Sequence, residues 1–94
     1  MYRPEDTLEI DVDGIETPQE LHHLLFKAFR FPDYYGNNWD AFDECISDVE
    51  VPGIVRIVGF GKLRALLPRD AGLLANCLRH FVEHHEPKIK LEIS

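Results

Sequence analysis

The side chains best able to do chemistry in this 94-residue chain fall in an acidic stretch and a histidine-rich stretch. No Lys or Arg occurs between Arg30 and Arg56, and the carboxylates of that interval are Asp33, Asp40, Asp43, Glu44, Asp48 and Glu50. The second stretch places His80, His84 and His85 beside Glu83. Groups of carboxylates can act as acid–base catalysts or attract a cationic partner, and paired histidines can ligate zinc.

Catalysis by the acidic stretch would require two carboxylates held across a substrate cleft. Asp40, Asp43 and Glu44 instead share one exposed face of a predicted helix, and so short a chain offers no evident cleft. A nucleophilic Cys45 would need a nearby base, and the sequence shows none. We therefore expect that the protein is not an enzyme.

The histidine pattern is a weak metal signature. His80 and His84 are four residues apart on a predicted helix, which suits zinc, but no Glu follows His80 directly and no third ligand is evident. The adjacent residues His22 and His23 diverge on a helix. A solvated, weakly polar helix end explains the histidines, and we expect neither a metal nor a cofactor.

Residues 38–49 predict an amphipathic helix when they are placed at about 100° per residue. Its apolar stripe consists of Trp39, Phe42, Ile46 and Val49. Its opposite side consists of Asp40, Glu44 and Ser47, flanked by Asp43 and Asp48. Like charges four residues apart destabilise a helix by about 0.2–0.5 kcal/mol per pair, and no Lys or Arg within the helix relieves them. The face is therefore either simply solvated or shaped for a basic partner.

The elements that position this helix alternate along the chain. Hydrophobic alternation predicts strands over residues 8–12 and 89–93, and the nearly continuous apolar run 54–58 predicts the buried centre of a sheet. Thr17, Pro18 and Glu20 predict the start of a first helix, which stops at Phe31-Pro32. Asn37 is the expected cap of the acidic helix. A short helix over 62–67 precedes a longer one that Asp70 caps and Pro87 ends.

Strands separated by helical crossovers favour parallel pairing. We therefore predict an α/β fold, a three-stranded, mostly parallel sheet packed with three to four helices. Short connections and the absence of repeats or linkers predict a single domain over residues 1–94.

Composition limits the function. A net charge of −7 argues against direct nucleic-acid binding, and no apolar run approaches the roughly 20 residues of a membrane span. The start Met1-Tyr2-Arg3-Pro4-Glu5-Asp6 lacks the pattern of a secretory signal, so we expect none. Cys45 and Cys77 fall among apolar residues of predicted helices. Buried free thiols are therefore expected, which suits the reducing cytoplasm.

A resemblance to the barstar family is carried by Tyr34-Tyr35-Gly36-Asn37-Asn38-Trp39-Asp40-Ala41-Phe42-Asp43-Glu44-Cys45-Ile46. In that family a tyrosine pair, Gly, Asn, Asp-Ala and an acidic-Cys-apolar run occupy the same positions. The resemblance extends more loosely from Leu8 to Ser94. It implies an intracellular inhibitor of small basic ribonucleases, whose second helix and preceding loop enter the nuclease active site.

The resemblance also assigns roles to single side chains. Glu44 would take the place of the RNA phosphate and meet the Arg, Lys and His groups of the enzyme. The other partner-binding residues are expected to be Tyr34, Asn38, Asp40, Asp43, Ser47 and, on the last helix, Glu83. The expected partner is a small basic ribonuclease or a related basic toxin. The protein would then be a bacterial-type cytoplasmic immunity protein, and we expect a monomer when it is free.

The chain departs from the family's namesake at three places. Asp43 stands where the namesake has Trp, Glu44 replaces its key Asp and reaches one methylene further, and Asp48-Val49 replaces Gly-Trp. Two aromatic contacts are missing and one acid is added. An alternative hypothesis is therefore a protein-binding module of the same fold with a different basic partner, such as a non-ribonuclease toxin or a regulatory protein.

Overall fold

The computed structural model describes residues 3–94. Met1 and Tyr2, the first two residues of the segment in which we expect no secretory signal, lie outside the described residues. The elements are β1 (Thr7–Asp11), α1 (Pro18–Phe29), α2 (Trp39–Asp48), β2 (Ile54–Val58), α3 (Phe60–Leu66), α4 (Pro68–His84) and β3 (Lys90–Ile93). The strands pair in the order β1-β2-β3, and both pairings are parallel. The predicted three-stranded α/β fold is confirmed, with a wholly parallel sheet.

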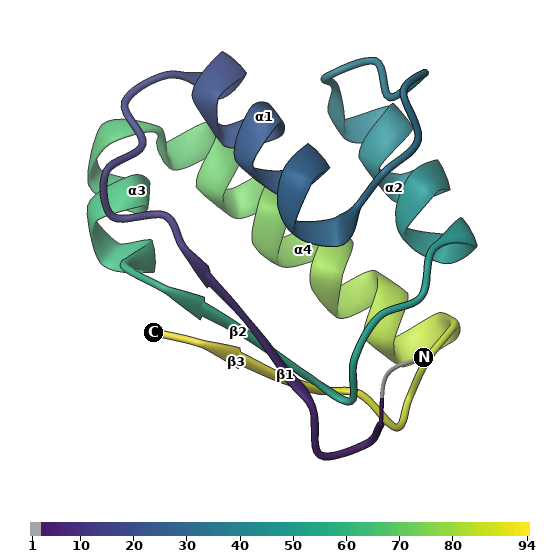
Figure 1. Cartoon of the computed structure of the whole chain (residues 1–94). Helices are drawn as coiled ribbons and strands as arrows, with labels where there is room; N and C mark the ends of the chain where they lie inside the picture. The colour runs from purple at the N-terminus through teal and green to yellow at the C-terminus, as the bar shows by residue number, and fades with distance from the viewer. Residues whose placement is uncertain (1–2) are drawn as a thin grey trace.

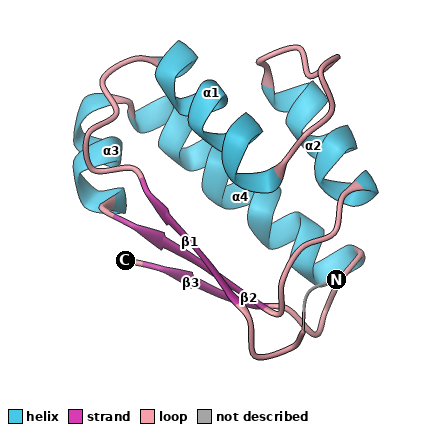
Figure 2. Cartoon of the chain, in the orientation of Figure 1, coloured by secondary structure: helices cyan, strands magenta, loops and turns pink. Residues whose placement is uncertain are grey.

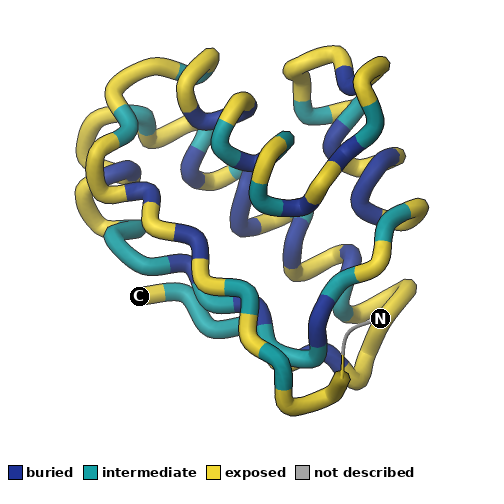
Figure 3. Tube along the Cα trace, in the orientation of Figure 1, coloured by how far each residue is buried: buried dark blue, intermediate teal, exposed yellow. Residues whose placement is uncertain are grey.

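The molecule has two layers (Figure 1). Helices α1, α2 and α4 lie on one side of the sheet, and α3 follows β2 at one end of it (Figure 2). Inward side chains of the strands, such as Ile10, Val55 and Ile57, join buried residues of α1, α2 and α4 in one apolar cluster. Figure 3 shows the buried positions recurring along these helices with exposed positions between them.

No helix of residues 3–94 covers the other face of the sheet, so the strand 54–58 is less buried than its apolar run predicts. β2 is central, as its apolar run predicts, but only Val55 and Ile57 are buried, while Ile54 and Val58 are half-buried. Arg56 lies on the open face, with its Nε 2.7 Å from Glu92 and its guanidinium 3.5 Å from Glu9. The hydrogen bond from Arg56 lowers the pKa of Glu92.

The start of α1 follows the predicted capping chemistry. Thr17 accepts a hydrogen bond from the Glu20 backbone N–H at 3.2 Å and donates to the Glu20 side chain at 3.1 Å, while Pro18 occupies the first turn. The helix ends at Phe29, and Arg30 follows in a left-handed conformation with φ 57°. The predicted stop at Phe31-Pro32 is therefore late by about a residue or two, a usual uncertainty for helix ends.

The prediction that Asp70 caps the long helix is wrong. Helix α4 begins at Pro68, with Leu67 at the cap position and no side-chain cap. Proline suits the first helical turn, where its missing N–H costs nothing. Asp70 lies within that first turn and is free to bond elsewhere. The expected short helix before it is confirmed as α3.

The turn from β2 into α3 depends on Gly59. Its φ is 77°, a conformation that residues with a Cβ rarely adopt, and a Cβ there would lie 2.7–2.8 Å from atoms of Asp13. We expect Gly59→Ala to lower the free energy of unfolding by about 2 kcal/mol or more. Gly72→Ala is the matched control, since its Cβ would meet nothing within 4 Å in α4.

Chemical denaturation of both variants and the wild type measures the difference. Gly72→Ala should raise stability by about 0.5–1 kcal/mol, because alanine favours a helix over glycine. Equal stabilities for the two variants would show that the Gly59 turn is not constrained in this way.

Candidate docking site on helix α2

Helix α2 begins one residue later than the predicted cap implies. Asn38, not Asn37, is the cap: its Oδ1 accepts from the Ala41 backbone N–H at 2.8 Å, and its Nδ2 donates to the Gly36 carbonyl at 3.2 Å. Asn37 has φ 53° and turns the chain into the helix. Either asparagine can cap, so the choice depends on the path of the preceding loop. The side chain of Asn38 thus shapes the start of the acidic helix.

The two faces of α2 are as the sequence predicts. Phe42, Cys45 and Ile46 are buried, and Trp39 and Val49 are half-buried. The exposed residues of the helix are Asp40, Asp43, Glu44, Ser47 and Asp48. Across residues 3–94, none of these four carboxylates takes part in an ion pair. The acidic face therefore carries unneutralised charge into solvent.

Two of the carboxylates border a groove between α2 and α4, with a volume of about 350 Å³. Its lining residues are Trp39, Asp40 and Asp43 of α2 and Leu73, Asn76, Cys77 and His80 of α4. Sequence reasoning identified Asp40 and Asp43 but missed that α4 contributes to this site. The spacing of residues 73, 76, 77 and 80 indicates that they share one face of a helix. It does not reveal which other element packs against that face.

The groove contains a thiol, that of Cys77, and an imidazole ring, that of His80. Burial, followed by the charges of Asp43 and Asp40, raises the pKa of Cys77, so the thiol keeps its proton. Within the part of the chain that the structure describes, no three His, Cys, Asp or Glu side chains converge as metal ligands. His80 and His84 instead contact each other, with ring centroids 4.4 Å apart. Both cysteines are free, Cys45 buried as expected and Cys77 only half-buried.

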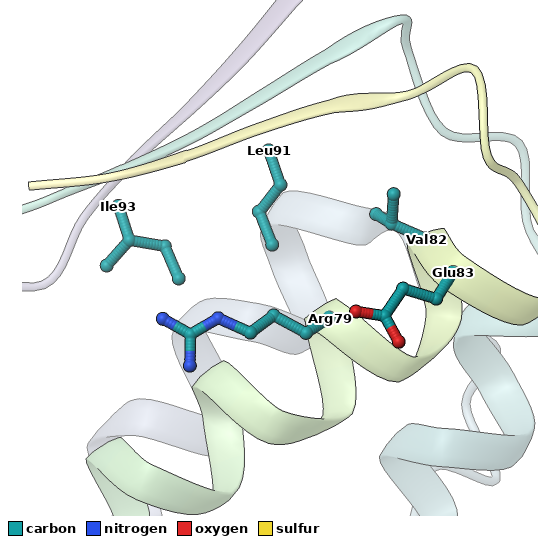
Figure 4. A pocket seen from close by; sticks show the side chains of 5 residues that line it. All are labelled: Arg79, Val82, Glu83, Leu91 and Ile93. Carbon is teal, nitrogen blue, oxygen red and sulfur yellow. The ribbon is translucent and has the colours of Figure 1, made fainter.

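Glu83 is not brought together with the α2 carboxylates. It lies on another face of α4 and lines a second groove against β3, with Arg79, Val82, Leu91 and Ile93 (Figure 4). Glu44 and Ser47 lie on α2 outside the groove that holds Asp40 and Asp43. Of the predicted partner-binding residues, four are thus exposed on α2, Tyr34 and Asn38 precede that helix, and Glu83 lies apart on α4.

The tyrosine pair before α2 divides, with one ring exposed and one buried. The Tyr34 side chain is 76% exposed, whereas Tyr35 is 7% exposed and packs against Phe31 with ring centroids 4.8 Å apart. Burial raises the pKa of Tyr35, so its phenol stays protonated. Tyr34 is consequently the ring available to a partner.

A buried polar connection, missed in the sequence, holds this loop and α2 in place. Nδ1 of His22 on α1 lies 2.6 Å from the Tyr35 hydroxyl, and the His22 ring packs on Trp39 at 4.6 Å. The Trp39 indole N–H donates to Asp70 on α4 at 3.0 Å. Burial lowers the pKa of His22, and the Asp70 charge only partly opposes this shift. The neutral imidazole therefore links α1, the loop, α2 and, through Trp39, α4.

Fold and surface together define a small α/β protein whose second helix presents four exposed carboxylates. A sequence model of the barstar family, described as Barstar (barnase inhibitor), matches residues 5–93, so the chain belongs to the barstar family. The resemblance seen in residues 34–46 is confirmed by this match. No match was found among curated proteins.

The helices of residues 3–94 include none with the length and apolarity needed to cross a membrane.

The buried histidine predicts a pH-dependent stability. Because the folded pKa of His22 is below its unfolded value of about 6.5, the unfolded chain binds a proton first as the pH falls. The contribution of His22 to stability is therefore complete above about pH 6.5 and decreases as the pH falls below it. Urea unfolding of the wild type at about pH 7.5 and about pH 5.5 measures the total decrease.

His22→Asn should show a smaller decrease between these two pH values than the wild type, whatever its absolute stability. The exposed neighbour His23 provides the control, and His23→Asn should retain the wild-type dependence. An unchanged pH dependence in His22→Asn would contradict the assignment of the effect to this buried ring.

Proposed function

We propose that this protein inhibits a small basic ribonuclease by inserting the acidic face of α2, with the loop before it, into the active site. The observation that carries the proposal is the helix itself. Trp39–Asp48 holds four exposed carboxylates and no cation, and within residues 3–94 none of these carboxylates forms an ion pair. Membership of a family described by barnase inhibition supplies the class of partner.

The charge pattern suits a ribonuclease because its active site binds a polyanion. Fixed carboxylates can occupy positions that RNA phosphates would take, and hydrogen-bonded charge pairs are stronger than neutral ones. Glu44 lies on the outer face of α2, so we assign it the central contact with the cationic groups of the enzyme. Opposite charge would also speed encounter, and contacts desolvated in the complex would slow dissociation.

The neighbouring residues supply supporting contacts. Asp40 and Asp43 border the groove and can receive an Arg or Lys side chain at its rim, with the apolar part of that side chain against Leu73. The exposed Tyr34 ring can stack on a partner residue. Ser47 offers a hydroxyl to the partner. In the free protein this hydroxyl donates to the Asp43 carbonyl oxygen at 3.4 Å. Asn38 acts by capping the helix, and Glu83 would contribute at a separate contact.

We also propose that the protein acts in the cytoplasm, as an immunity protein that protects the cell against the nuclease. Both cysteines are free thiols, which supports a reducing compartment. Burial, followed by the charges of Asp43 and Asp40, raises the pKa of Cys77 in the groove. A thiol of raised pKa is a poor nucleophile for disulfide exchange.

A second candidate partner is a basic toxin that does not cleave RNA. It is favoured by Asp43 and Val49, which stand where the family's namesake has tryptophans. Asp43 is exposed beside the groove, and Val49 is half-buried against the core. The docking surface therefore has one more carboxylate and two fewer large rings, which favours a smaller and more cationic counterpart.

Calorimetric titration into a catalytically disabled small basic ribonuclease tests the inhibitor function. We expect binding that weakens as salt is raised, since charge pairs at the rim are screened. Glu44→Gln should weaken binding by roughly 30-fold or more. This corresponds to about 2 kcal/mol, the lower end of a range for buried charge pairs defined in part on the barnase–barstar complex itself.

Glu16→Gln is the matched control, because Glu16 is exposed outside α2 and the change removes the same charge. It should leave affinity within about twofold of the wild type. No binding to any small basic ribonuclease would contradict the proposed inhibition and favour the second candidate. Equal losses for both variants would show that only net charge, and not the α2 face, matters.

A further inference from the structure

Among residues 3–94, strand β3 has a neighbouring strand on one side only, so its other side is an open edge of the sheet. It pairs with β2 on one side, where the Lys90 N–H donates to the Gly53 carbonyl at 2.9 Å and the Ser94 N–H donates to the Ile57 carbonyl at 2.8 Å. Alternate residues of a strand direct their backbone groups to opposite sides, so Leu91 and Ile93 present N–H and C=O outward. Such a row of groups is a template for a further strand.

A groove lies beneath this edge, between β3 and α4. It has a volume of about 460 Å³ and is lined by Arg79, Val82, Glu83, Leu91 and Ile93. Its apolar residues are half-buried, and its two charged residues make no ion pair within residues 3–94. Figure 4 shows the Arg79 guanidinium near Ile93 and the Glu83 carboxylate extending toward the start of the Arg79 side chain, with Leu91 on the β3 side of the groove.

We propose that two copies of this chain associate through their β3 edges, antiparallel about a two-fold axis at Leu91. The two sheets then form one continuous sheet, and the two Leu91 residues exchange a pair of backbone hydrogen bonds. This association does not depend on ribonuclease inhibition. It differs from the monomer expected from the sequence, because the order of strands in the sheet is visible only in the fold.

Charge complementarity identifies a second copy as the occupant. In this register, the residues on either side of Leu91 face each other, so Lys90 lies opposite Glu92 of the second copy. Lys90 and Glu92 already approach to 3.4 Å within one chain, and pairing completes an alternating ring of four charges. The same axis brings the Arg79 end of the groove opposite the Glu83 end of the second copy.

The strand has two features that guard edges, its short length and the charged Lys90. In the proposed pairing Lys90 lies opposite an acidic residue of the second copy. Its charge therefore favours pairing with a second copy over pairing with another strand that has a lysine at the opposite position. The net charge of −7 opposes association, but the charges assigned to this edge cancel: Arg79 and Glu83 lie on its helix side, and Lys90 and Glu92 lie on the open side of the sheet. The acidic groove beside α2 uses other residues of α4, so self-association leaves the α2 face open, and of the proposed nuclease contacts only Glu83 lies in the β3–α4 groove.

Analytical ultracentrifugation over a wide concentration range tests the proposal. The wild-type mass should rise from 10.9 kDa toward twice that value. Arg79→Glu places like charges opposite each other at two symmetric positions, and it should weaken the dimer by roughly tenfold. The swap Arg79→Glu with Glu83→Arg restores opposite charges and should restore the wild-type dissociation constant.

Circular dichroism confirms that each variant is folded. A wild-type protein that stays monomeric at the highest concentration would overturn the proposal. So would a dimer that Arg79→Glu leaves unchanged, which would indicate another interface. A third outcome would also contradict the proposal: the protein is monomeric, and Arg79→Glu weakens its binding to the nuclease. The β3 edge would then contact the partner protein and not a second copy.

Discussion

The structure depends on burial of the apolar side of α2 against the rest of the core. Four carboxylates within ten residues repel one another, and no cation on the helix relieves them. An isolated helix of this length and charge would not be stable in water. Full burial of Phe42 and Ile46 contributes about 1.5–3 kcal/mol each, which exceeds the repulsion of roughly 0.2–0.5 kcal/mol per pair. Packing of one side thus permits unneutralised charge on the other.

The buried polar contacts give this packing a defined geometry. An apolar stripe alone would allow α2 to slide, whereas directional bonds restrict it. The Trp39–Asp70 hydrogen bond ties the first residue of α2 to α4, and the His22–Tyr35 contact ties the preceding loop to α1. Asn38 then sets where the helix begins. Binding surfaces held in place before association lose less entropy on binding, which suits an inhibitor built on α2.

Local patterns predicted the elements well, and long-range contacts explain what they missed. Hydrophobic alternation and the Thr17 cap identified the strands and α1, because these signals are contained within a few residues. Asp70 resembles a cap in sequence, but the Trp39 indole takes its carboxylate in the fold. The apolar run of β2 suggested two covered faces, and only the topology reveals that Arg56 lies on an open one. The acidic face of α2 was predictable, whereas the α4 side of its groove required the packing of two helices.

We propose that the partner recognises the α2 face specifically and is not attracted by the net charge of the protein alone. Backbone amide chemical shifts recorded with and without a catalytically disabled small basic ribonuclease test it most directly. We predict large changes over residues 34–48 and at the groove residues Cys77 and His80, with little change along β1. Changes confined to other elements, with residues 34–48 unaffected in a saturated complex, would contradict the account.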